Sequence, residues 1–212
     1  MQSPLSPPAL RTLIRQRLLD HAGAGEVGGD HVVAGVPAEP HPLRAAAVLV
    51  PLVERPGGFT VLLTRRTDHL QHHAGQVSFP GGRVEPFDDG PVDTALREAE
   101  EEIDLLRGQV EVAGFLDPYQ TVTGFLVTPV VGFVRPPLKL RPDPEEVAEV
   151  FELPLDVVLD VRNHQRHSRE FRGQERHFYV LPYRHHYIWG ATAAMLVGFA
   201  RRLTTPAPLE QS

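Results

Sequence analysis

The chain has 212 residues, of which 42% are hydrophobic, and its formal net charge at pH 7 is −6. This size suffices for one domain with a single core, and the acidic balance argues against a nucleic-acid binder or a membrane-surface protein, because both rely on a basic field. Cysteine is absent from the sequence, which excludes disulfides, thiolate catalysis and cysteine-ligated zinc.

The first 43 residues are expected to form a tail, a short helix and a linker. They begin MQSPLSPPAL, without the basic-then-apolar order of a signal peptide, and no later apolar run reaches the roughly 18 residues of a membrane span. We therefore expect a cytoplasmic protein with no membrane partner. Apolar residues at helical spacing over Leu10–His21 predict an amphipathic helix, and the Gly- and Pro-rich run 22–42 predicts a linker.

One domain is expected to extend from residue 44 to residue 203, with a flexible tail over residues 204–212. Its first strand, Arg44–Val53, is a continuous apolar run and is predicted to be buried on both faces. The other predicted strands are Phe59–Thr64, Gln76–Phe79, Val110–Leu116, Phe125–Val134, Val147–Phe151 and a hairpin of Arg166–Phe171 with Arg176–Leu181, and the predicted helices are Pro91–Ile103 and Trp189–Leu203. This order lacks a regular strand-helix alternation and predicts an α+β sandwich with a mixed β-sheet.

The predicted helix that ends at Ile103 carries a stripe of acidic residues beside its apolar face. At about 100° per residue, Glu98, Glu101 and Glu102 fall next to one another on the rim of that face. Three carboxylates on about one turn repel one another, and a hard divalent cation would offset the repulsion. A solvated acidic run is the alternative, but the glycine turn Phe79-Pro80-Gly81-Gly82 lies directly upstream and favours a ligand site.

The run from Gly82 to Leu105 resembles the Nudix box. Arg97-Glu98-Ala99-Glu100-Glu101-Glu102-Ile103 fits the core of that pattern, although the preceding loop is one residue longer and Asp104 stands where glycine is usual. Further stretches are similar to the coenzyme A pyrophosphatases of this family, with Gln71 where arginine is expected. These stretches are Leu62–Arg66, His73–Gly82 and Ile188–Ala193.

The resemblance implies a Nudix α/β/α sandwich, a Mg²⁺ or Mn²⁺ cofactor and a small-molecule substrate. That substrate would be coenzyme A or a derivative, cut to 4′-phosphopantetheine and adenosine 3′,5′-bisphosphate. The resemblance places metal ligation on Glu98, Glu101, Glu102 and the backbone carbonyl of Gly81, or of Gly82. Glu98 and Arg97 are the expected catalytic residues, Glu98 as the base and Arg97 as an anchor for Asp88 or Asp89. The residues expected at the substrate are Arg65, Arg66, Gln76, Phe79, Gly82 and Arg83.

Other residues leave alternatives open. Glu145 and Glu146 could supply a second catalytic carboxylate, although solvated loop residues are the simpler interpretation. His72 and His73 could contact substrate. The remaining histidines considered lack the spacing of a zinc site and are interpreted as structural or solvated: His164, His167, His177, His185 and His186.

Aromatic residues and rival functions are equally open. Trp189 and Phe199 are interpreted as core residues of the last helix, whereas Tyr119, Phe125 or Tyr187 could stack on adenine. A Nudix hydrolase of ADP-ribose or NADH, and a catalytically silent module that binds nucleotides, are the rival functions. The N-terminal helix could contribute to a homodimer.

Overall fold

The computed structural model describes residues 6–36, 42–70, 72–171 and 173–205. Gln71 and most of the predicted C-terminal tail lie outside this set. The helices are α1 (Pro7–Arg17), α2 (Asp30–Ala34), α3 (Pro91–Ile103), α4 (Leu155–Leu159) and α5 (Gly190–Thr204), with short 3₁₀ turns at Arg107–Gln109 and Val161–Asn163. The strands are β1 (Gly28–Gly29), β2 (Arg44–Arg55), β3 (Gly58–Arg66), β4 (Val77–Ser78), β5 (Gly81–Arg83), β6 (Val110–Phe115), β7 (Tyr119–Gln120), β8 (Phe125–Val134), β9 (Val147–Pro154), β10 (Gln165–Phe171), β11 (Gln174–Tyr183) and β12 (His186–Trp189).

Within the described part of the chain, the strands form two sheets. The larger has the path β1-β7-β8-β2-β3-β4, with β5 paired to β2, β6 to β8 and β9 to β3; the smaller has the order β10-β11-β12. Strands β2 and β8 run parallel, whereas β3 and β5 run antiparallel to β2. The predicted mixed sheet is therefore confirmed.

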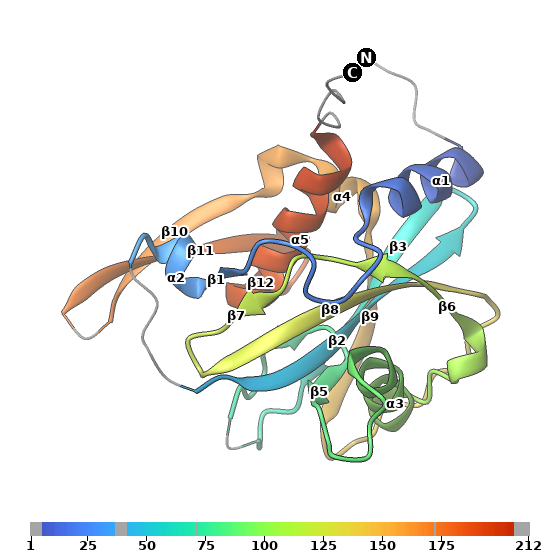
Figure 1. Ribbon diagram of the computed structural model, residues 1–212, viewed down its shortest axis with the longest axis horizontal. Helices are drawn as coiled ribbons and strands as arrows, with labels where there is room; N and C mark the ends of the chain where they lie inside the picture. The colour runs from blue at the N-terminus through green and yellow to red at the C-terminus, as the bar shows by residue number, and fades with distance from the viewer. Residues whose placement is uncertain (1–5, 37–41, 71, 172, 206–212) are drawn as a thin grey trace.

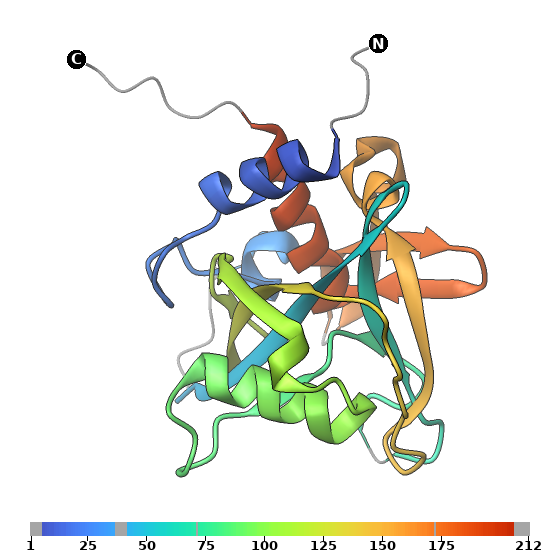
Figure 2. The same ribbon diagram turned by 90° about the vertical axis from the view of Figure 1, so that its right-hand side faces the viewer.

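Helices cover both faces of the larger sheet, which confirms the predicted sandwich. Helix α3 lies below the sheet in Figure 1, and α1 and α5 lie above it; Figure 2 shows the same layers from the side. Alternate residues of β2 pack against the helices on opposite faces of the sheet, because successive side chains of a strand point to opposite faces. Leu49 packs in the α3 layer, and Val50 packs in the layer of α1 and α5, both with no exposed surface.

The N-terminal segment is more structured than the sequence predicts. Helix α1 ends at Arg17 because Leu18 is extended (φ −81°, ψ 161°), so the prediction of helix up to His21 is wrong for the last turn. Ile14 is fully buried and joins α1 to the core beside α5. The predicted linker contains β1 and α2, which pairing with β7 and packing on β11 hold in place. No helix among the described residues is long and apolar enough to span a bilayer.

Candidate active site

Helix α3 carries the acidic residues and is held to the sheet by its apolar face. It begins at Pro91, where a missing N–H costs nothing, and buries Ala95, Ala99 and Ile103. It ends at Ile103, and the capping residue that follows, Asp104, has a φ of 57° and a ψ of 31°, the left-handed conformation that glycine favours. The departure from the usual glycine therefore leaves the helix end in its ordinary geometry.

Arg97 connects this helix to the loop before it. Its Nε donates to Asp88 Oδ1 (2.9 Å) and its Nη2 to Asp88 Oδ2 (3.0 Å), a paired contact that fixes the guanidinium plane. These bonds hold the pKa of Asp88 well below its usual range. The Nη1 atom donates to Glu98 Oε1 and to Glu101 Oε2, both at 2.9 Å. Asp88, and not Asp89, is thus the loop acid that Arg97 anchors.

The carboxylate of Glu98 lies directly against the glycine turn. A Cβ atom on Gly82 would lie 2.4 Å from Glu98 Oε1, so only glycine leaves room for this carboxylate. Strand β5 holds the turn in place through its pairing with β2, where Gly82 lies opposite Ala47 and Gly81 opposite Val48. Burial raises the pKa of Glu98, and the hydrogen bond from Arg97 opposes that rise.

Glu102 is the most buried of the three glutamates, with 5% of its surface exposed. Burial raises the pKa of Glu102 to about 8, and the nearby charge of Glu98 adds to the rise. Its Oε2 atom is buried without a hydrogen-bond partner among the described residues, and its Oε1 lies 3.9 Å from Arg66 Nη1. An ionised carboxylate in this position needs a cation.

These features fit a divalent cation. The unpartnered oxygen of Glu102 and the Glu98 carboxylate beside Gly82 would hold it, together with Glu101 once that side chain leaves Arg97. The side chain of Glu101 is 61% exposed, and within the described residues the three glutamates do not all bring an oxygen within 4.8 Å of one another. The predicted ligand set, including the carbonyl of Gly81, stays a prediction.

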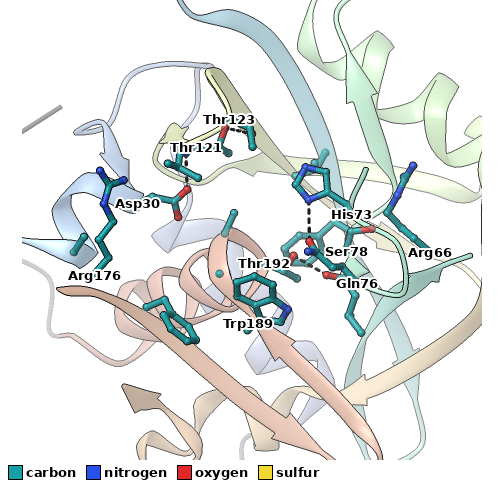
Figure 3. Close-up of a pocket in the computed structure, with 18 of the residues that line it drawn as sticks. Asp30, Arg66, His73, Gln76, Ser78, Thr121, Thr123, Arg176, Trp189 and Thr192 are labelled. Carbon is teal, nitrogen blue, oxygen red and sulfur yellow. Dashed lines mark hydrogen bonds between the residues drawn. The ribbon is translucent and has the colours of Figure 1, made fainter. Parts of the chain in front are cut away.

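A cavity of about 550 Å³ lies beside the part of the larger sheet that carries Arg66 and Gly81 (Figure 3). Arg66 and Gly81 line it on the side of the glutamates, and Trp189 lies on the side of the smaller sheet. Its volume is in the range of small-molecule sites. The lining residues are Asp30, Ala34, Val48, Arg66, His73, Gln76, Val77, Ser78, Phe79, Gly81, Thr121, Val122, Thr123, Arg169, Arg176, His177, Phe178, Trp189, Gly190, Ala191 and Thr192.

Three of the predicted substrate residues line this cavity: Arg66, Gln76 and Phe79. The other three do not. Arg65 Nη1 pairs with Asp68 at 3.0 Å, Gly82 faces Glu98, and Arg83 is exposed with its carbonyl accepting a bond from Arg97.

The open alternatives are placed differently. His73 lines the cavity, and its Nδ1 lies 2.9 Å from Gln76 Oε1, whereas His72 does not line it. Glu145 is solvated, with 86% of its side chain exposed. The Glu146 carboxylate lies 4.0 Å from Arg66 Nη2, and its charge also raises the pKa of Glu102.

The aromatic residues correct one interpretation. Trp189 lines the cavity and meets Phe178 edge to face at 5.7 Å, so the core interpretation is wrong for Trp189, whereas Phe199 is fully buried in the core. The three adenine candidates do not line the cavity: the Tyr119 hydroxyl donates to Asp30 Oδ1 (2.8 Å), the guanidinium carbon of Arg44 lies 4.0 Å above the ring of Phe125, and Tyr187 is half exposed.

Sequence reasoning missed most of the far wall of the cavity. Asp30 lay in the supposed linker, and Arg169 and Arg176 looked like ordinary strand residues of a hairpin. A signal was available for Trp189, because the stretch Ile188–Ala193 resembles the coenzyme A pyrophosphatases. The guanidinium of Arg169 lies 5.2 Å above the Trp189 ring, which places a cation beside the cavity.

Comparison with known proteins identifies the family of this chain. A family model described as the NUDIX domain matches residues 43–174. The chain is 44% identical over 160 residues to the Uncharacterized Nudix hydrolase NudL of Photorhabdus laumondii, covering 76% of this chain and 85% of that protein. It is 42% identical over 164 residues to the protein of the same name in Pectobacterium atrosepticum, with 77% and 85% covered. A solved Nudix hydrolase from M. smegmatis, RenU, shares 27% identity with a TM-score of 0.47, over 58% of this chain and 78% of that one.

Proposed function

Because this chain belongs to the Nudix hydrolase family, we propose that it hydrolyses the phosphoanhydride of coenzyme A or of a coenzyme A derivative. The products are 4′-phosphopantetheine and adenosine 3′,5′-bisphosphate. The observation that carries this proposal is where three stretches of sequence meet. Those that resemble the coenzyme A pyrophosphatases, Leu62–Arg66, His73–Gly82 and Ile188–Ala193, all contribute side chains to the same cavity beside Glu102.

The walls of that cavity suit a long, partly anionic substrate. Arg66, Arg169 and Arg176 are cationic groups on the lining of a protein whose net charge is −6, so the local field can favour a diphosphate where the overall charge does not. Phe79, Phe178 and Trp189 provide apolar surface for an uncharged arm or a base.

The reaction that these residues support is attack of water on one phosphorus of the diphosphate. A new P–O bond forms between the water oxygen and that phosphorus, and the bridging P–O bond breaks. The displaced phosphate group leaves as part of the second product. In this proposal Glu98 accepts the proton of the attacking water, and the hydrogen bond from Arg97 holds its carboxylate in position. A Mg²⁺ or Mn²⁺ ion, when bound, would neutralise charge that develops on the phosphoryl oxygens.

Hydrolysis assays with the purified protein test the substrate. Coenzyme A, ADP-ribose and NADH are compared at equal Mg²⁺, and the products are identified by mass spectrometry. We expect kcat/KM to be highest for coenzyme A. A higher value for ADP-ribose would replace the proposed substrate, and binding without turnover of any of them would favour the catalytically silent module.

The glutamates are tested with a matched control on the same helix. We expect Glu102→Gln and Glu101→Gln to lower kcat at least about 100-fold, the scale of removing one charge-stabilising group. Glu100→Gln is the control, because the side chain of Glu100 is 41% exposed and its Oε2 lies 3.6 Å from Arg107 Nε, away from the other glutamates. A kcat for Glu101→Gln and Glu102→Gln as high as that of Glu100→Gln would refute the metal role of these two glutamates.

We further propose that the protein acts in the cytoplasm and that α1 contributes to a homodimer. The apolar face of α1 is already used by the core, since Leu10 and Ile14 are buried there. A dimer must therefore use its outer face. Light scattering coupled to size-exclusion chromatography measures the mass, and the mass of a single chain would contradict the dimer.

A further inference from the structure

A second group of side chains that could ligate a metal lies on the opposite face of the larger sheet from α3. It consists of Glu149 in β9, His185 in the β11–β12 turn and His186 at the start of β12. Phe151 packs in the layer of α5 and Val150 in the layer of α3. Since side chains alternate along a strand, Glu149 points to the same face as Phe151 and away from the glutamates of α3.

The three side chains converge on one point. Each offers one ligand atom, and these atoms all lie within 4.8 Å of one another. His186 Nε2 lies 3.2 Å from Glu149 Oε1, and His185 Nε2 lies 3.7 Å from Glu149 Oε2. A tetrahedral ion with bonds of about 2.0–2.2 Å separates its ligand atoms by roughly 3.3–3.6 Å. The two observed contacts, each to a different oxygen of Glu149, are therefore close to the spacing that such an ion imposes.

His186 provides the independent argument for a ligand. Its side chain is 3% exposed, and neither ring nitrogen has a hydrogen-bond partner among the described residues. The ring of Phe151 stacks on it at 3.6 Å with an interplanar angle of 9°. The 3.2 Å approach to Glu149 is close, yet it is not aligned as a hydrogen bond. A buried imidazole without partners is costly. An ion held between His186 Nε2 and Glu149 Oε1 would give both atoms a partner and would bring them this close without a hydrogen bond.

We propose that Glu149, His185 and His186 bind a divalent transition-metal ion, with Zn²⁺ as the ion to test. Two imidazoles and one carboxylate suit such ions and leave a fourth position for water. Mg²⁺ prefers oxygen ligands in an octahedral arrangement and does not suit this set. The group is therefore chemically distinct from the oxygen-only site on α3. Arg65 Nε lies 3.9 Å from Glu149 Oε2 and is the cation that competes for this carboxylate.

The position of the ion gives it a structural role. Strand β9 belongs to the larger sheet and β12 to the smaller one, so a shared ion would tie the two sheets together. Strand β12 runs from His186 to Trp189, which lines the cavity. Binding of the ion would thus stiffen the wall of the cavity that the smaller sheet provides, without touching substrate.

Titration calorimetry with Zn²⁺, in the presence of saturating Mg²⁺, tests this proposal. We expect one Zn²⁺ per chain and a rise in Tm of about 5–10 °C when free Zn²⁺ exceeds Kd a hundredfold. Because loss of an outer partner of a metal ligand already costs 10–100-fold in affinity, His185→Ala and Glu149→Gln should weaken binding at least about 100-fold. The His185 side chain is 72% exposed, so its removal should leave the Tm of the metal-free protein unchanged.

His21→Ala and Glu98→Gln are the controls. His21 is an exposed histidine outside the cluster, and Glu98 belongs to α3; both variants should bind Zn²⁺ like the wild type. Co²⁺ gives a second readout, because a tetrahedral site with nitrogen ligands absorbs visible light strongly and an octahedral oxygen site does not. Zn²⁺ affinity that is unchanged in His185→Ala, or lost in Glu98→Gln, would overturn the proposal. Since the readout is metal binding and not turnover, such a failure leaves the proposed hydrolase untouched.

Discussion

Substitution of Gly82 by alanine is the sharpest test of the geometry around Glu98. The new Cβ would lie 2.4 Å from Oε1 and 2.5 Å from Cδ of Glu98, whereas real Cβ atoms essentially never approach other atoms within 3.0 Å. The carboxylate must therefore move by at least about 0.6 Å, and misplacement of a reacting group by about 1 Å can cost about 100-fold in rate. We expect kcat to fall by roughly 10- to 100-fold, which corresponds to about 1.4–2.7 kcal/mol of barrier.

The fold should survive this change, because the displaced atoms are the end of a flexible side chain. Gly81→Ala gives the contrast: its Cβ would lie 2.4 Å from the carbonyl oxygen of Ala47, and its φ of 155° disfavours a side chain. That variant should lower Tm strongly. Gly57→Ala is the control, since no atom lies within 4 Å of its Cβ position. The measurements are kcat with coenzyme A at saturating Mg²⁺ and Tm; wild-type kcat in Gly82→Ala would refute the placement of Glu98.

Three further predictions concern stability. Ile14→Ala should lower the free energy of unfolding by about 2–5 kcal/mol, because Ile14 is fully buried, and a loss under about 1 kcal/mol in urea unfolding would show that α1 is dispensable. Asp104→Gly should raise that free energy by about 0.5–1 kcal/mol, since glycine adopts the left-handed conformation at lower cost; a decrease would show that the contact of Asp104 with Arg141 dominates. Burial raises the pKa of Glu102 from 4.5 to about 8 in the folded protein. Without metal, the Glu102 carboxyl therefore ionises at a lower pH in the unfolded chain than in the folded one, and the free energy of unfolding falls as the pH rises from about 4.5 to about 8. The Tm of the wild type should then drop between pH 5 and 8 relative to the Tm of Glu102→Gln. The same dependence of Tm on pH in both proteins would contradict the raised pKa of Glu102.

The long periodic elements could be predicted from the sequence. Helix α3 and strand β8 have the predicted bounds, Pro91–Ile103 and Phe125–Val134, because each has enough residues for its apolar spacing to be read. Strands β1, β5, β7 and β12 and helices α2 and α4 were not predicted. They are two to five residues long, too short for a period, and β5 exists because it pairs with β2, far away in the sequence.

Only the part of the candidate site that lies within one element could likewise be predicted from the sequence. Arg97 and the three glutamates follow from spacing within one helix, which fixes their relative positions whatever the rest of the fold does. The cavity could not be predicted in this way, because its walls come from separate segments, among them α2 with Asp30 and β10 with Arg169. The Glu149–His185–His186 group was missed for the same reason: only the two histidines are neighbours in sequence, and the carboxylate comes from another sheet.

Strand β2 explains why the glutamates and the glycine turn meet at all. At Ala47 it pairs with Gly82 of β5 through the backbone, and the Ala47 side chain is fully buried in the cluster that contains Ala95 and Ala99 of α3. Small side chains on both sides allow the helix axis to approach the sheet closely, and the missing side chain of Gly82 leaves the space that Glu98 fills. The same strand thus sets the distance of α3 from the sheet and the position of the glycine turn. The separation of Glu98 from the turn is therefore a property of the core, and it is fixed before any cation or substrate binds.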